Sequence, residues 1–284
     1  MSVPRKFKTS PSPSQLQAMA RDLQFYPSET QNPSGLTRQQ IASYNRDGYI
    51  KGLRIFDAHE IAEHRCYFDS LLADVMSAGG SSYSISSAHL KSGKVYDLMK
   101  HPCIVSCVQD LLGEQIVGLA SQFFCKLPHD SVTVSWHQDA GYWPITPSKT
   151  VTIWLAVDDA DAENSCMRFM AGSHLHGHLP HRMSREVENN LFNLTALDVE
   201  RYGTCVDVDL KAGEISMHSD LLLHSSDANR SDRRRCGLTL RYCAIDVRAI
   251  PGFGWAEEGV IISGEDPINH WGNPERPTQD FTLA

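Results

Sequence analysis

The sequence has no long apolar run, and none approaches the roughly 20 residues that a membrane-spanning helix requires. Its first residues are polar and rich in proline and serine, unlike a secretory signal. Positive charge is scarce, with 26 lysines and arginines against 34 aspartates and glutamates, which gives a net charge of −8. This balance disfavours a nucleic-acid-binding surface. We therefore expect a cytoplasmic protein of unspecified oligomeric state that acts on a small molecule and binds neither nucleic acid nor membrane.

Two common cofactor and scaffold motifs are also missing. The eight cysteines form no CxxC pair, so we expect reduced thiols rather than a zinc ribbon or a disulfide scaffold. No G-x-G-x-x-G motif occurs to indicate a nucleotide cofactor.

What the sequence does contain is a His-X-Asp motif, His137-Gln138-Asp139, followed far along the chain by His224. Side chains two apart in a strand point to the same face, so His137 and Asp139 would lie together. His224 follows an apolar run that reads as a strand. Two histidines and one carboxylate form the facial triad of non-haem Fe(II) oxygenases, which leaves metal positions open.

Arg235 lies eleven residues beyond His224, at the start of an apolar strand. A buried arginine needs an anionic partner, and its planar guanidinium suits a carboxylate. Together with the triad, Arg235 indicates an Fe(II) enzyme with an oxo-acid cosubstrate.

Simpler interpretations remain for each of these residues. The His-X-Asp pair alone is compatible with two surface residues of a strand, and Arg235 with an internal salt bridge. Zn²⁺ would also fit the triad, but a catalytic zinc site gives no reason for Arg235. The histidines at positions 174, 176, 178 and 181 are expected to be structural rather than metal-binding.

The pattern along the chain changes near residue 114. Residues 1–36 contain five prolines, of which those at 11, 13, 27 and 33 break any long helix, and are expected to form a loosely ordered arm. Helical periodicity then predicts helices after Thr37, over residues 59–76 and over residues 95–112, which make a helical preface at 37–113.

Short runs rich in β-formers follow, separated by Pro, Gly, Asp and Asn. About eight strands over residues 115–265 predict a mainly β fold with N-terminal helices: a jelly roll, or double-stranded β-helix of the cupin type, with helices packed on one face. Residues 37–284 would form one domain, with an insertion at about 183–204 as a candidate lid.

The ordered motifs resemble the phytanoyl-CoA dioxygenase family over about residues 38–265. The resemblance is carried by residues 136–139, 151–160, 163–174 and 213–235. It implies a double-stranded β-helix with Fe(II) held by His137, Asp139 and His224, and 2-oxoglutarate paired with Arg235. O₂ would be the second cosubstrate. Asp139 separates the chain from halogenases of this type, which lack the carboxylate, and Ser165 stands where the family usually has glycine.

Further site residues follow from the resemblance. Ser226 resembles the hydroxyl that assists the arginine, Trp154 a tryptophan placed against the cosubstrate, and Lys94 a lysine that some members use for 2-oxoglutarate. Gln122, Phe124 and Lys126 alternate on one strand, and their shared face is expected to point into the barrel, with Gln122 near the cosubstrate and Lys126 near the substrate.

The substrate is inferred from aromatic residues near the ligand strand. Tyr142 and Trp143 directly follow it, and aromatic faces at a site mouth suit a cationic amine. Trp255, His270 and Trp271 lie in a C-terminal segment that would fold over the opening. We expect hydroxylation of a small polar or zwitterionic metabolite, with an amine-bearing phosphonate as the specific hypothesis. The alternatives are hydroxylation of an acyl-CoA, desaturation, epoxidation or endoperoxidation at the same iron, and a cupin-like binding protein without activity.

Overall fold

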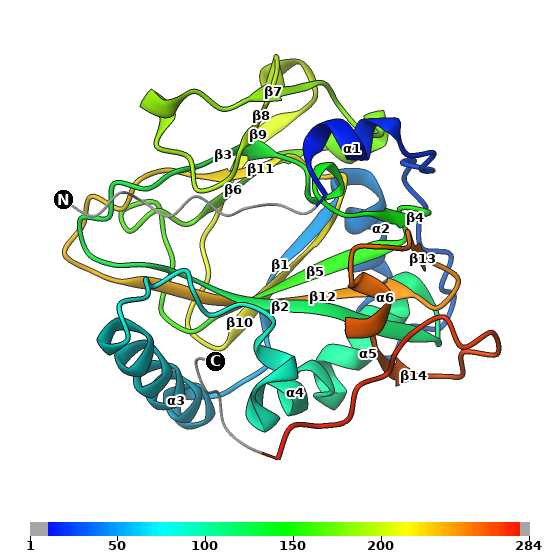
Figure 1. Ribbon diagram of the computed structural model, residues 1–284, viewed down its shortest axis with the longest axis horizontal. Coiled ribbons are helices and arrows are strands. Elements are labelled where there is room, and N and C mark those ends of the chain that lie inside the picture. Colours follow the sequence, from blue (N-terminus) through cyan, green and yellow to red (C-terminus); the bar gives the residue numbers. More distant parts are fainter. Residues whose placement is uncertain (1–10, 279–284) are drawn as a thin grey trace.

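Two antiparallel sheets face each other in the computed structural model, which describes residues 11–278 (Figure 1). In spatial order, the larger sheet contains β1 (Tyr49–Arg54), β10 (Glu214–Ser219), β5 (Thr150–Ala156), β12 (Arg235–Ala244), β2 (Ile116–Lys126) and β14 (Val260–Ser263). The smaller sheet contains β3 (Val134–His137), β11 (His224–Ser226), β6 (Met167–Ala171) and β9 (Thr204–Val208). The expected mainly β architecture is confirmed.

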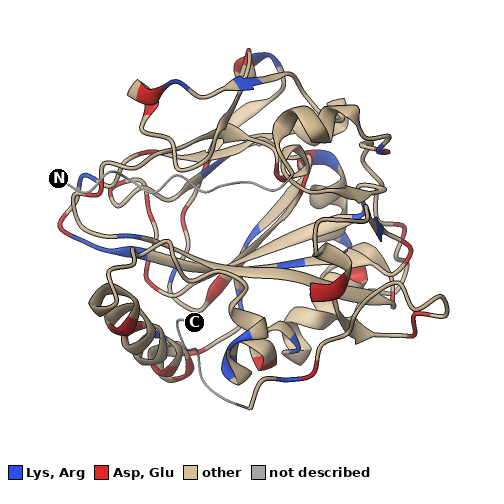
Figure 2. Ribbon diagram, viewed as in Figure 1, with Lys and Arg blue, Asp and Glu red and all other residues tan. Residues whose placement is uncertain are grey.

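β12 divides the molecule into a core on one side and an interior cavity on the other. Each of its ten residues is buried, because β5 and β2 flank the strand. Cys236, Leu238, Leu240 and Tyr242 alternate onto the outer face and join the main apolar core. The intervening residues therefore point between the two sheets. Figure 2 shows most charged residues on helices and loops, with a few lysines and arginines within the strands.

Four helices follow the N-terminal segment: α2 (Arg38–Asp47), α3 (Ala58–Ser77), α4 (Gly93–Met99) and α5 (Pro102–Leu112). α2 begins as predicted, since the Thr37 side chain accepts from the Gln40 N–H and the Gln40 side chain accepts from the Thr37 N–H. α3, α4 and α5 lie on the outer side of the larger sheet, where their apolar residues join the main core (Figure 1). The helices are thus on one face of the sheet, as expected.

The helical preface differs from the prediction in two places. Residues 95–112 do not form one helix: α4 ends at Met99 and α5 begins at Pro102. Proline has no N–H to donate within a helix and is favoured in its first turn, so Pro102 starts a new helix instead of continuing the old one. In addition, β1 lies within the preface and pairs with β10, extending the larger sheet.

The N-terminal segment is tied to the domain wherever the structure describes it, which corrects the expectation of a loose arm for residues 11–36. α1 (Pro13–Ala18) buries Leu16, and the Arg21 guanidinium donates to the carbonyls of Ala140 and Trp143. Prolines prevent a long helix here but do not prevent packing. Residues 1–10 lie outside the described residues, as do residues 279–284.

The carboxylate of Asp110, on α5, holds the end of this segment. It accepts hydrogen bonds from the N–H groups of Ser34, Gly35 and Leu36 at 2.7–3.1 Å and is almost completely buried. Three backbone donors converging on one carboxylate satisfy both its charge and their own hydrogen-bonding needs.

The segment between β6 and β9 forms a small hairpin of β7 (His181–Met183) and β8 (Leu194–Ala196), with short 3₁₀ turns on either side of β8. Its loop is anchored to the start of β3: the Asn190 side chain accepts from the Ser135 N–H and donates to Ser184 and to the Leu194 carbonyl. The remaining elements are β4 (Ile145–Thr146), β13 (Arg248–Ala249) and α6 (Trp255–Glu258). Within residues 11–278, no helix has the length and apolar character needed to cross a membrane.

Replacing Asp110 with alanine should lower the free energy of unfolding by about 3 kcal/mol, because three N–H groups lose a charged acceptor. The change is measured by denaturant unfolding, and limited proteolysis should show faster cleavage within residues 19–36. Asp74→Ala, at an exposed position of α3, is the matched control. Equal stability and equal cleavage in the two variants would contradict the assigned role of Asp110.

Candidate active site

Three predicted ligands meet between the two sheets. His137 ends β3, His224 begins β11, and the two residues are directly paired across the smaller sheet. Their ring centroids are 4.1 Å apart. Asp139 Oδ1 lies 3.9 Å from Nε2 of each histidine, and one ligand atom of each residue lies within 4.8 Å of the others. The three side chains are therefore close enough to share one metal ion.

Both histidines are oriented by backbone carbonyls. Nδ1 of His137 is 2.8 Å from the Ser135 carbonyl, and Nδ1 of His224 is 3.0 Å from the Leu222 carbonyl. A proton on Nδ1 makes these hydrogen bonds and leaves Nε2 as the lone-pair donor, as in metal-binding histidines. Burial lowers the pKa of His137 well below its usual value, which favours the neutral form that binds metals.

Asp139 reaches the site by a different route from the one predicted. β3 ends at His137, and Asp139 begins a 3₁₀ turn. Gln138 between them keeps an extended conformation (φ −114°, ψ 134°), so the two-residue alternation survives the end of the strand. The Gln138 amide points the other way and donates to the Gly177 and Leu221 carbonyls.

The charge of Asp139 is stabilised by its surroundings. Burial alone would raise its pKa, but Arg241, His224 and His218 nearby and a hydrogen bond from Thr152 together lower it. The Thr152 hydroxyl donates to Asp139 Oδ2 at 3.1 Å, leaving Oδ1 on the side of the histidines. The carboxylate is thus ionised and oriented before any ligand binds.

Arg235 is buried without a protein counter-ion. Its Nε donates to the Ser165 carbonyl at 3.1 Å and its Nη2 to the Ser226 hydroxyl at 3.2 Å. Its guanidinium carbon lies 5.6 Å from the centre of the Trp154 ring. Among residues 11–278, no carboxylate lies within 4.0 Å of it, so the alternative of an internal salt bridge is wrong. The structure brings Arg235, Ser226 and Trp154 together as predicted.

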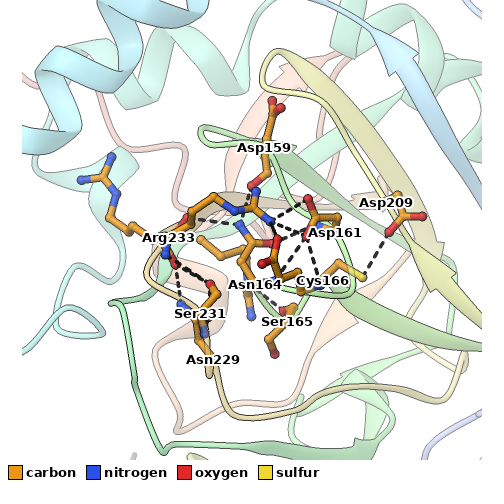
Figure 3. Close-up of polar contacts among 12 residues, drawn as sticks. Asp159, Asp161, Asn164, Ser165, Cys166, Asp209, Asn229, Ser231 and Arg233 are labelled. Atoms are coloured by element: carbon orange, nitrogen blue, oxygen red, sulfur yellow. Dashed lines mark hydrogen bonds and ion pairs between the residues drawn. The ribbon is translucent and has the colours of Figure 1, made fainter.

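A polar network in the loops beside Arg235 fixes the Ser165 carbonyl (Figure 3). Asn164 donates to the carbonyls of Asp159 and Arg234, and Arg233 pairs with Asp161. Ser165 itself has a positive φ of 69°, a conformation that favours glycine, the residue usual in the family. Its hydroxyl donates to the Asp227 carbonyl, a bond that glycine could not make.

A single pocket joins the triad to Arg235. Of the residues predicted for the site, the following seven line it: His137, Asp139, His224, Arg235, Ser226, Trp154 and Lys126. Lys126 points its Nζ at three backbone carbonyls, those of Val132, Ser226 and Asp227. Burial, with Arg235 nearby, lowers its pKa to about 6. Through its three hydrogen bonds, Lys126 connects β2 to the loop before β3 and to the segment at the end of β11.

Two predicted cosubstrate residues are not placed at the pocket. Lys94 is exposed on α4, on the far side of the larger sheet, with its Nζ 4.4 Å from the centre of the Tyr67 ring. That prediction is wrong because the helical layer and the cavity lie on opposite faces of the sheet. Gln122 is buried on β2 opposite Thr239, but it does not line the pocket.

The predicted substrate residues Tyr142 and Trp143 do not line the pocket. Tyr142 and Trp143 belong to a second apolar core together with Trp271. The 3₁₀ turn at Asp139 redirects the chain, so the residues after it pack into this core instead of lining the pocket. The Tyr142 ring lies 5.8 Å from the His137 ring, and its hydroxyl accepts from the Leu194 N–H.

Several pocket residues were not predicted from the sequence. Phe192, supplied by the β7–β8 loop, forms an aromatic wall with Phe124, which was expected to point into the barrel, and His218 and Arg241 lie beside Asp139. The alternation of β12 contains the signal for Arg241, since it stands six residues after Arg235 and thus on the same face. No local pattern pointed to His218 or Phe192.

A metal-sized His–Asp–His cluster inside a jelly roll, beside a buried unpaired arginine, defines the class of non-haem Fe(II) oxygenases. The model of the phytanoyl-CoA dioxygenase (PhyH) family matches residues 44–237, and the chain belongs to this family. The expected enzyme class is confirmed: an Fe(II)- and 2-oxoglutarate-dependent dioxygenase that uses O₂.

Relatives and solved structures agree with this assignment. A probable phytanoyl-CoA dioxygenase of Caenorhabditis elegans is 22% identical over 287 residues, covering 89% of this chain and 91% of the relative. A probable alpha-ketoglutarate-dependent hypophosphite dioxygenase of Stutzerimonas stutzeri is 27% identical over 192 residues, covering 65% of each chain.

Among solved structures, the non-heme monooxygenase ThoJ in its apo form has a TM-score of 0.68 at 25% identity, covering 85% of this chain and 89% of ThoJ. EctD from S. alaskensis, solved with 2-oxoglutarate and 5-hydroxyectoine, has a TM-score of 0.69 at 20% identity, covering 81% and 85%. These likenesses confirm the predicted jelly-roll fold.

The geometry at Gly237 yields a test of the Arg235 side of the pocket. A Cβ added to Gly237 would lie 2.0 Å from Cζ2 of Trp154, so the indole must move in Gly237→Ala. We expect 2-oxoglutarate to bind about tenfold more weakly, since the ring beside Arg235 is displaced, while Fe(II) affinity is unchanged. Anaerobic equilibrium dialysis measures the first and chelator competition the second. Unchanged 2-oxoglutarate affinity would show that Trp154 does not shape this part of the pocket.

Proposed function

We propose that the chain is an Fe(II)- and 2-oxoglutarate-dependent hydroxylase of a small polar or zwitterionic metabolite. The observation that carries this is the presence, in one pocket, of a three-residue ligand cluster and a buried arginine that has no counter-ion among residues 11–278. Burying an unpaired charge is costly, so such an arginine is expected where a ligand supplies the anion.

The residues present fit both groups. His137, Asp139 and His224 would hold Fe(II), since their ligand atoms converge and both Nδ1 atoms are occupied by carbonyls. Arg235, assisted by Ser226 and flanked by Trp154, would hold the far carboxylate of 2-oxoglutarate. When bound, the metal and cosubstrate supply the O₂ chemistry that couples C–H hydroxylation to decarboxylation of 2-oxoglutarate to succinate.

The protein's own contribution is to orient ligands and exclude water. The carbonyls of Ser135 and Leu222 fix the imidazole rings, and Thr152 fixes the carboxylate. Phe124 and Phe192 cover one wall with their ring centroids 6.1 Å apart. Because Phe192 comes from the 183–204 insertion, we propose that this insertion closes over bound substrate.

The lining of the pocket favours a small anionic or zwitterionic substrate. Its only carboxylate among the described residues is Asp139, whereas Arg235 and Arg241 carry permanent positive charge. A phosphonate or carboxylate suits this surplus, and an amine on the same molecule would meet the rings of Phe124 and Phe192. The relative named for hypophosphite supports a phosphorus oxyanion as one such group.

The assay is substrate-dependent succinate formation with Fe(II), ascorbate, 2-oxoglutarate and O₂. Its panel contains aminoalkylphosphonates, their N-methylated forms, hypophosphite, betaines, amino acids, ectoine and an acyl-CoA. We expect one succinate for each product that is heavier by one oxygen atom. A product lighter by two hydrogens would instead show desaturation, and activity with the acyl-CoA alone would replace the proposed substrate class.

In the same assay, Asp139→Ala should lower turnover at least ~100-fold and weaken Fe(II) binding while the circular dichroism spectrum is unchanged, because the metal loses its only anionic protein ligand. Asp246→Ala, which removes an exposed carboxylate paired with Lys149, is the control and should leave turnover unchanged. Full activity of Asp139→Ala would refute the ligand assignment.

A further inference from the structure

Arg241 is a second buried cation in the pocket, and the cosubstrate-binding role proposed for Arg235 gives Arg241 no function. The residue is only 9% exposed, and its Nε has no hydrogen-bond partner. Within residues 11–278, its side chain lies near two aromatic rings, those of Phe124 and Trp143, and near one carboxylate, that of Asp139. The approach to Asp139 Oδ2 is 4.0 Å, too long for a hydrogen bond.

His218 is a second unsatisfied group at the same place. It is 1% exposed, and neither ring nitrogen has a hydrogen-bond partner among the described residues. Its Nε2 lies 3.9 Å from Asp139 Oδ2, the same oxygen that Arg241 approaches. Buried polar atoms in native proteins are nearly always paired, so two orphans converging on one point indicate a missing ligand.

The sheet places these two residues on either side of Thr152. Thr152 on β5 is directly opposite His218 on β10 and directly opposite Arg241 on β12. Directly opposed residues in neighbouring strands project to the same face of a sheet. His218, Thr152 and Arg241 therefore form one transverse row that lines the pocket beside Asp139.

Arg235 and Arg241 occupy different ends of the pocket. The two arginines are six residues apart on β12, which separates their Cα atoms by about 20 Å in an extended strand. A five-carbon diacid that binds the metal and Arg235 lies on one side of the triad. Arg241 lies beside Asp139, at the other end of the pocket.

We propose that Arg241, with His218, forms the subsite for the acidic group of the substrate, a phosphonate or a carboxylate. The assignment rests on the proposed function for its cosubstrate geometry. Arg241 supplies the permanent charge and the donor fork, and His218 supplies one N–H. The rings of Phe124 and Trp143, whose centroids are 6.0 and 5.4 Å from the guanidinium carbon, flank the arginine and shield it from water.

The competing explanation is that Arg241 only stabilises Asp139. Arg241→Met separates the two roles because methionine keeps much of the volume and removes the charge. If Arg241 serves Asp139 alone, the variant should bind Fe(II) more weakly and melt at a lower temperature. If it serves the substrate, the Fe(II)-loaded, probe-free variant should melt no lower than the wild type, since the metal then compensates Asp139.

The test is anaerobic calorimetry of methylphosphonate and, separately, acetate binding to protein loaded with Fe(II) and saturated with 2-oxoglutarate. Arg241→Met should weaken methylphosphonate binding about 10- to 100-fold, as expected for loss of a charged hydrogen-bond partner. Its 2-oxoglutarate affinity, from dialysis, should change less than about threefold. Arg235→Gln should show the reverse pattern, and Arg46→Gln, whose salt-bridge partner is Asp47 at the end of α2, should change neither.

Tighter binding of methylphosphonate than of acetate would assign the subsite to a phosphonate, and the reverse order to a carboxylate; both support the proposal. It is overturned if the wild type binds neither probe, or if Arg241→Met binds both as the wild type does. A lower melting temperature and weaker Fe(II) binding, with probe affinity per loaded protein unchanged, would also overturn it. Failure of the proposed function gives a result distinct from failure of the subsite. In that case 2-oxoglutarate does not bind, yet methylphosphonate binds metal-free protein in an Arg241-dependent manner.

Discussion

The two-residue alternation of β12 is the constraint on which the rest of the structure depends. The strand is flanked by β5 and β2, so its backbone groups are satisfied within the sheet and its side chains divide strictly between two faces. The outer face fills the core beneath the helices with apolar side chains. The inner face carries two arginines, which a wholly apolar interior would not tolerate. One strand therefore builds the core and the pocket at once.

The loops that hold Arg235 illustrate how the protein stabilises a buried cation without neutralising it. Its partners are a carbonyl and a hydroxyl, which accept hydrogen bonds but carry no charge. The carbonyl belongs to Ser165, whose left-handed backbone is unfavourable for a serine and is offset by the hydroxyl bond to Asp227. A carboxylate in that position would have made a salt bridge and left nothing for the cosubstrate to bind.

Site residues that are identified by short-range spacing were predicted from the sequence. Site residues whose position depends on the path of the chain in space were not. The ligand triad, Arg235, Ser226 and Trp154 could be found because each sits in a local pattern within a strand or a family motif. Tyr142 and Trp143 do not line the pocket, because adjacency to a ligand in the sequence does not determine where the chain turns next. Lys94 was assigned to the site although its helix packs against the outer face of the sheet. His218 reaches the pocket through the pairing of β10 with β5, and Phe192 through the β7–β8 loop; neither placement is revealed by sequence periodicity.

Because Arg235 and Arg241 lie on the same strand, β12, the distance between their Cα atoms is fixed by the strand. A β-strand is nearly inextensible, so the span between the cosubstrate end and the Arg241 end of the pocket varies little with temperature or bound ligand. For a substrate anchored at Arg241, this span acts as a ruler that selects the carbon presented to the metal. Regioselectivity would then be counted from the acidic group of the substrate, and longer homologues would react at the same carbon from that end.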